Sequence, residues 1–68
     1  MYKRQALTSR EREVVEAIVT GLDNQQIAAR MFVSPFTVKT HANRAMTKVG
    51  ARDRAQLVSM AVRAGMRP

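Results

Sequence analysis

The sequence predicts an all-α fold of four short helices, and three observations support this prediction. First, a residue type that commonly caps helix N-termini precedes each of four segments with helical apolar spacing. These residues are Thr8, Asp23, Ser34 and Asp53. Second, a glycine, which ends helices readily, follows three of these segments, at Gly21, Gly50 and Gly65. Third, no stretch alternates apolar and polar residues as a strand does.

The composition limits both the size of the fold and the kind of partner. The 68 residues form one small domain with a marginal core, and there is no cysteine for disulfides or thiolate metal sites. Twelve Lys and Arg against five Asp and Glu give a formal net charge of +7, which suggests nucleic acid or an anionic membrane as partner. No apolar run approaches the ~20 residues of a membrane span and no signal peptide is apparent. We therefore expect a soluble cytoplasmic protein that does not enter the membrane, with a flexible basic lead-in at residues 1–6 and the domain at residues 7–68.

The first two helices are expected to form the scaffold. Thr8 and Glu11 make a capping box, and the helix that they open should end near Val19. Its core positions are Val14, Val15 and Ile18. Asp23 caps the second helix, which should run to about Met31 with Ile27, Ala28 and Met31 turned inward. Phe32 and Val33 are expected to fill the corner before the third helix.

The third helix is expected to carry the function. Ser34 is its N-cap, Pro35 suits its first position, and Gly50 should end it. At about 100° per residue, one stripe is apolar, namely Val38, Ala42, Ala45 and Val49. The opposite face carries Phe36, Lys39, Thr40, Asn43 and Thr47, and one flank carries Thr37, His41, Arg44 and Lys48. This helix has no carboxylate, and such an arrangement suits a helix that lies in the major groove.

Charge and apolar spacing add two further points. No acid occurs between Asn24 and Arg52, so the positive charge is concentrated around the third helix. The short helix, tight turn and longer polar-faced helix make a helix-turn-helix.

The fourth helix, from Asp53 to about Ala64, has two apolar stripes about 140° apart by the helical step. The first stripe is Ala55, Val58 and Val62, and the second is Leu57, Met60, Ala61 and Ala64.

Four motifs in order resemble the LuxR-type helix-turn-helix domain, which is also the effector domain of NarL- and FixJ-like response regulators and of GerE-like regulators. These are Leu7-Thr8-Ser9-Arg10-Glu11-Arg12-Glu13-Val14-Val15, Gly21-Leu22-Asp23-Asn24-Gln25-Gln26-Ile27-Ala28, Thr37-Val38-Lys39-Thr40-His41 with Lys48-Val49-Gly50, and Arg54-Ala55-Gln56. The resemblance implies a four-helix domain that binds double-stranded DNA as a dimer and controls transcription.

Carried over residue by residue, the resemblance places Lys39, Thr40 and Asn43 at base edges. It places Thr37, Lys48, Asn24 and Gln25 at phosphates. The sequence departs from the family pattern at Phe36, where a polar residue is usual, at Ala42 and Ala45, which are smaller than usual, and at Asp23, which replaces Ser or Thr.

Several residues allow two interpretations. Arg44 either contacts a phosphate or forms a salt bridge with an acid of the first helix. Phe36 either touches a thymine methyl group, as a base contact, or packs on the second helix. His41 makes a hydrogen bond within the fold or to a phosphate; a metal role is not expected, and neither is any cofactor. No catalytic constellation is spaced for an enzyme.

The second stripe of the fourth helix, Leu57, Met60, Ala61 and Ala64, is expected to form a homodimer interface, because so small a domain has little core to cover it. An alternative function is an interaction module that pairs through the fourth helix and binds DNA weakly. The promoter-reading domain of sigma factors shares a Ser-Pro-x-Thr-Val-Lys signature, but the capped fourth helix favours the LuxR type. The sequence does not decide the operator, the direction of control, the controlling signal or whether a regulatory domain precedes Met1.

Overall fold

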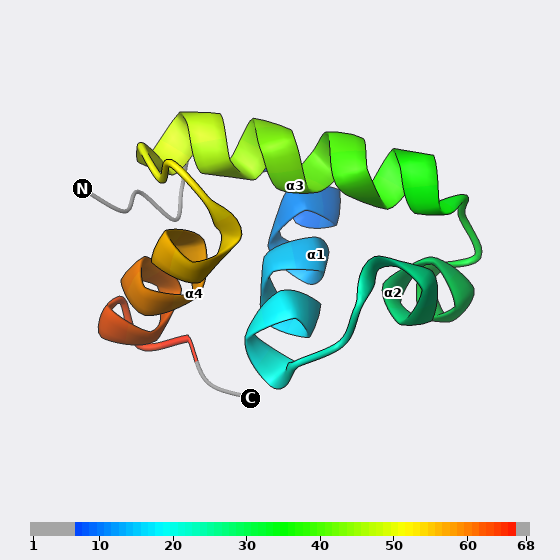
Figure 1. Cartoon of the computed structure of the whole chain (residues 1–68), viewed down its shortest axis with the longest axis horizontal. Coiled ribbons are helices and arrows are strands. Elements are labelled where there is room, and N and C mark those ends of the chain that lie inside the picture. Colours follow the sequence, from blue (N-terminus) through cyan, green and yellow to red (C-terminus); the bar gives the residue numbers. More distant parts are fainter. Residues whose placement is uncertain (1–6, 67–68) are drawn as a thin grey trace.

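The computed structural model describes residues 7–66, so the lead-in predicted at residues 1–6 lies outside the described part. Four helices follow one another in this part: α1 (Ser9–Thr20), α2 (Asn24–Met31), α3 (Pro35–Val49) and α4 (Arg54–Arg63). The longest helix, α3, extends along one side of the molecule, with α1 crossing beneath its middle and α2 and α4 near its two ends (Figure 1). Within the described residues there is no strand, and no helix is long and apolar enough to cross a membrane.

The predicted caps are confirmed, and they explain where each helix begins. Thr8 and Glu11 form the expected capping box, in which each residue's backbone N–H donates to the other's side chain. Asp23 makes a second capping box with Gln26 that the sequence interpretation did not include. Ser34 and Asp53 accept from backbone N–H groups of α3 and α4. Each of the four expected cap residues therefore stands directly before the first residue of a helix.

The turn between α2 and α3 contains an unusual backbone conformation. Phe32 caps the C-terminus of α2 in the left-handed region, with φ 58°, a conformation that bulky residues rarely adopt. Its side chain is 94% exposed, so the expectation that Phe32 fills the corner between the helices is wrong. Val33 does pack against the core. The left-handed turn directs the Phe32 side chain outward while the next residue turns inward.

The core is built around α1 and confirms the predicted inward positions of the first three helices. Side chains from all four helices meet there, and the largest that are fully buried are Val14, Val15, Ile27, Val38, Val49 and Leu57. Because α3 buries its whole predicted stripe against this core, its opposite face is fixed toward solvent. The packing thus sets the rotation of α3 about its own axis.

The structure corrects the prediction for α4. Leu57 and Ala61 are 0% exposed in the single chain, so the stripe predicted as a dimer interface is largely core. Met60 and Ala64, the other two members, are half-buried. The exposed apolar residues of α4 belong to the other stripe, where Val62 is 49% exposed. Helical spacing identifies two stripes, but only packing against α1 decides which one turns inward. The stripe that turns inward is the one that contains the larger leucine side chain.

Candidate nucleic-acid interface

The outer face of α3 is organised by its first turn. The Ser34 hydroxyl accepts from the Thr37 backbone N–H at 3.1 Å and lies 3.0 Å from the Thr37 hydroxyl. Pro35 occupies the start of the helix, where a missing N–H removes no helical hydrogen bond. A capped first turn presents the residues that follow at defined angles, and the N-terminal part of a recognition helix usually meets base edges.

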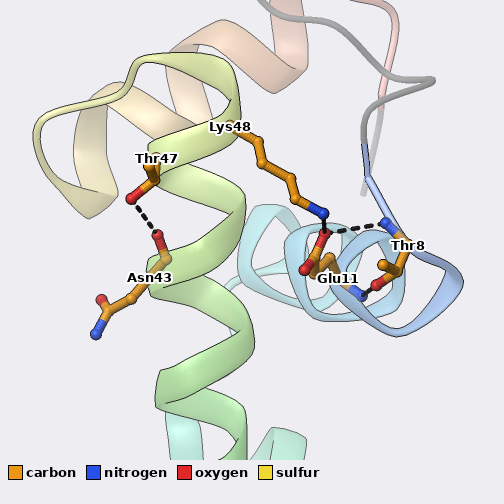
Figure 2. Close-up of polar contacts among 5 residues, drawn as sticks. All are labelled: Thr8, Glu11, Asn43, Thr47 and Lys48. Atoms are coloured by element: carbon orange, nitrogen blue, oxygen red, sulfur yellow. Dashed lines mark hydrogen bonds and ion pairs between the residues drawn. The ribbon is translucent and has the colours of Figure 1, made fainter.

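The predicted reading residues share one solvent-facing surface of α3. Lys39 and Asn43 are exposed and Thr40 is half-buried. The Asn43 amide projects away from α1, as Figure 2 shows. A shallow hollow of about 280 Å³ lies at this side chain and is lined by Asn43, Arg44, Thr47 and Lys48. The face therefore offers an amine and an amide to an approaching partner.

Phe36 adds a large apolar group to this face. Its side chain is 77% exposed, so of the two interpretations of this residue the structure excludes substantial packing on α2. The ring lies in the first turn of α3, on the same side as Thr40. An aromatic side chain is thus available to a partner beside the polar groups.

The flank of α3 contains groups of different character. Arg44 is exposed, and among the residues that the structure describes it forms no ion pair, so the alternative of a salt bridge to α1 is not found. His41 is half-buried, and its Nδ1 atom is buried with no hydrogen-bond partner in the described part. Thr37 is also half-buried. Arg44 is therefore the flank residue with the most accessible charge.

Lys48 is held by an acid of α1. Its Nζ lies 2.7 Å from Oε1 of Glu11, and Figure 2 shows the lysine side chain extending from α3 across to that carboxylate on α1. Glu11 is 2% exposed, whereas the Lys48 side chain is 35% exposed. A salt bridge to an acid of α1 was one of two interpretations of Arg44, but the cation that makes it is Lys48. The ammonium has further N–H donors beyond the one given to Glu11.

Glu11 is ionised in an environment that would by itself oppose ionisation. Burial is the largest single influence and raises the pKa of Glu11, but hydrogen bonds from Lys48 and Thr8 and the positive charge of Lys48 outweigh it. The net result is a pKa below the ordinary value of a glutamate. The carboxylate therefore compensates part of the charge of Lys48 at neutral pH.

The N-terminus of α2 lies beside the start of α4. Arg54 Nη1 donates to Oδ1 of Asn24 at 2.7 Å, and Arg54 Nη2 donates to the Leu22 carbonyl at 3.0 Å. Gln25 is exposed, and this region lines an open hollow of about 550 Å³. The two predicted phosphate-binding residues thus differ: Gln25 is accessible, and Asn24 is oriented by Arg54, a residue that sequence reasoning did not place at this site. Arg54 carries no sequence signal for this contact, because its partners lie about thirty residues away in the chain.

The sequence of this chain is similar to those of known bacterial regulatory proteins. The family described as "Bacterial regulatory proteins, luxR family" matches residues 5–61. The chain is 48% identical over 59 residues to the uncharacterized transcriptional regulatory protein YxjL of Bacillus subtilis, covering 87% of this chain and 27% of that protein. It is 41% identical over 61 residues to the transcriptional regulatory protein FixJ of Bradyrhizobium diazoefficiens, covering 90% of this chain and 30% of FixJ.

A solved structure shows the same fold. The chain superimposes on the crystal structure of full-length FixJ from B. japonicum with a TM-score of 0.82 and 39% sequence identity, covering 94% of this chain and 32% of that one. The chain thus spans less than a third of the length of these relatives.

Proposed function

Because the chain belongs to the luxR family of bacterial regulatory proteins, we propose that it binds double-stranded DNA with α3 in the major groove and thereby regulates transcription. One observation carries the proposal: α3 turns toward solvent a face that holds Lys39, Asn43 and Arg44 and contains no carboxylate. Ordinary solvated surfaces mix charges of both signs. A face of donors and cations on a helix that lies along one side of the molecule fits the acceptor-rich edges and phosphates of a duplex.

Base recognition is assigned to the exposed face of α3. Lys39 can donate to guanine O6 and N7, and the Asn43 amide can pair with adenine at N6 and N7. Phe36 and Thr40 lie on the same face and complete the proposed base contacts. The support is their shared orientation and exposure, together with their place in the family motif.

Phosphate contacts are assigned to the flank of α3 and to the start of α2. The proposed residues are Thr37, His41, Arg44, Lys48, Asn24 and Gln25. Arg44 is accessible and has no acidic partner in the described chain, so it is the cation best placed to hold a phosphate. Lys48 contributes through the N–H donors that Glu11 leaves unused. The backbone N–H groups that open α2 suit an anion, as helix N-termini do.

Two features of the assembly extend the proposal. We infer a homodimer through the outer stripe of α4, Ala55, Val58 and Val62, because a second copy would cover the exposed Ala55 and Val62 and the part of Val58 that the core leaves accessible. The relatives are several times longer than this chain, so we also propose that a regulatory domain acts with it in a non-enzymatic, cytoplasmic regulator of the response-regulator type.

Binding to genomic DNA fragments by gel shift tests the proposal. We expect discrete shifted bands that survive excess unrelated competitor DNA. Lys39→Glu should abolish them, whereas Arg63→Glu, with the same change of charge at the far end of α4, should leave them. If the wild-type chain shifts no fragment more strongly than bulk DNA while still pairing with another regulator, the interaction-module alternative replaces this function.

A further inference from the structure

Two threonines on the outer face of α3 use their hydroxyl protons within the helix. The Thr40 hydroxyl donates to the Phe36 carbonyl at 3.1 Å, and the Thr47 hydroxyl donates to the Asn43 carbonyl at 3.1 Å. The second of these bonds is drawn in Figure 2. A threonine hydroxyl has a single proton, so neither residue has one left to donate to a partner. The methyl group is the remaining γ substituent of each side chain.

These threonines belong to a stripe whose largest member is apolar. By the ~100° helical step, residues 36, 40, 43 and 47 fall within about 60° of one another. Phe36 is 77% exposed at one end of this stripe. The stripe is therefore an aromatic ring, a methyl group, an amide and a second methyl group. It is much less polar than its threonines suggest.

We propose, on the basis of the proposed function, that α3 reads the 5-methyl groups of thymine through Phe36 and the methyl group of Thr40, with Thr47 as a further contact where the helix follows the groove. The thymine methyl is the one apolar group on the base edges of the major groove, and apolar side chains contact it. Phe36 and Thr40 are about 6 Å apart along the helix axis, at ~1.5 Å per residue. That separation spans about two base pairs at ~3.4 Å each.

Thr40 could instead contact a base through its hydroxyl oxygen, and this alternative predicts different effects of substitution. Its oxygen keeps lone pairs and could accept from cytosine N4 or adenine N6. Valine keeps the methyl group at this position and replaces the hydroxyl with a second methyl group, whereas serine keeps the hydroxyl and removes the methyl group. These two variants therefore separate methyl recognition from hydroxyl recognition.

The matched control for this pair lies outside the interface. Thr20, in α1, makes the same kind of bond, because its hydroxyl donates to the Glu16 carbonyl at 2.9 Å. Thr20→Val and Thr20→Ser therefore report the effect of these changes on the helix alone. They should leave DNA binding unchanged.

The test begins with selection of binding sites from a random duplex library by the 68-residue chain. Each thymine of the selected site is then replaced by uracil, which lacks only the 5-methyl group. We expect affinity to fall about threefold to fivefold at the one or two positions that face Phe36 and Thr40, as burial of one methyl-sized group implies. Thr40→Val should keep the uracil effect at its position, and Thr40→Ser should remove it.

Uracil duplexes that bind as tightly as thymine duplexes would overturn the inference and leave the proposed function standing. A uracil effect that survives Thr40→Ser but disappears in Thr40→Val would equally overturn the role given to the Thr40 methyl group. If the selection enriches no sequence at all, the proposed function itself fails and the inference falls with it.

Discussion

The ammonium of Lys48 lies 2.7 Å from the carboxylate of Glu11, and this ion pair joins the last turn of α3 to the first turn of α1 (Figure 2). Glu11 also accepts from the Thr8 backbone N–H at 2.9 Å, so one carboxylate both caps α1 and ties α3 to it. The pair therefore helps to fix how far the proposed reading face stands out from the scaffold.

Replacing Lys48 with alanine should destabilise the domain by about 1–3 kcal/mol, because Glu11 would stay buried without its counter-charge. The expected loss is below the ~3–5 kcal/mol of a fully buried pair, since a third of the Lys48 side chain is in water. Urea unfolding monitored by circular dichroism measures it. Lys39→Ala, which removes an exposed lysine of the same helix, is the control, and equal stability of the two variants would contradict the prediction.

The stability of the domain should fall in acid through Glu11. The pKa of Glu11 is lower in the folded chain than its ordinary value, so the stabilisation is fully present above about pH 4.3, the pKa of an unfolded glutamate. It is lost as the pH falls from there through the folded pKa. Unfolding free energies between pH 7 and pH 3 should therefore drop more steeply for the wild type than for Glu11→Gln. Parallel curves for the two proteins would show that Glu11 does not carry this dependence.

Asn43→Ala and Lys39→Ala should each reduce the preference for a selected site over scrambled DNA. Each removes a contact to a base edge that is worth ~1–3 kcal/mol when well formed. Competition binding with both duplexes gives the specificity ratio directly. Arg63→Ala, on α4, should leave that ratio unchanged. If both α3 variants keep the wild-type ratio, other residues read the bases.

Arg44→Ala should weaken binding to all sequences alike. Each phosphate contact releases counterions, so the slope of log affinity against log salt should become shallower by about one. Arg63→Ala should leave the slope as it is in the wild type. We expect a smaller change for Lys48→Ala, because Glu11 already compensates part of that charge. A slope that Arg44→Ala does not alter would remove Arg44 from the phosphate contacts.

The helices could be predicted from the sequence because their signals are local. Ser34, Pro35 and Gly50 delimit α3 through contacts within a few residues. The buried stripe of α3 follows from helical periodicity alone. The same reasoning gave the exposed positions of Lys39 and Asn43, since they lie opposite that stripe.

Features that depend on contacts between helices were not predictable in this way. Lys48 and Glu11 are 37 positions apart, and their spacing in the sequence carries no sign of the pair. Which stripe of α4 turns inward depends on the shape of the surface that α1 offers, so the assignment of Leu57 failed. Phe32 looks like a core residue by composition, yet its left-handed backbone directs it outward.

Val62→Glu should abolish cooperative binding to a full operator while sparing binding to a half-site. In the proposed dimer, the outer stripe of α4 packs against its own copy across a two-fold axis, so one substitution places two like charges at the seam. Two like charges that face each other across an interface disfavour association strongly, and we expect at least a tenfold loss of cooperativity. The recognition helix of each chain is untouched, so half-site affinity should remain.

The change has to be made at Val62 rather than at Leu57. Val62 is 49% exposed, whereas Leu57 is 0% exposed and a glutamate there would unfold the domain. Gln56→Glu is the matched control, because it adds the same charge on another side of α4, where the side-chain Oε1 of Gln56 accepts from the Arg52 backbone N–H. Titration of full-site and half-site duplexes, with sedimentation of the free chain, measures the effect. Since the stripe is small, the free chain should be largely monomeric and pair on DNA, and cooperativity retained in Val62→Glu would move the dimer contact away from α4.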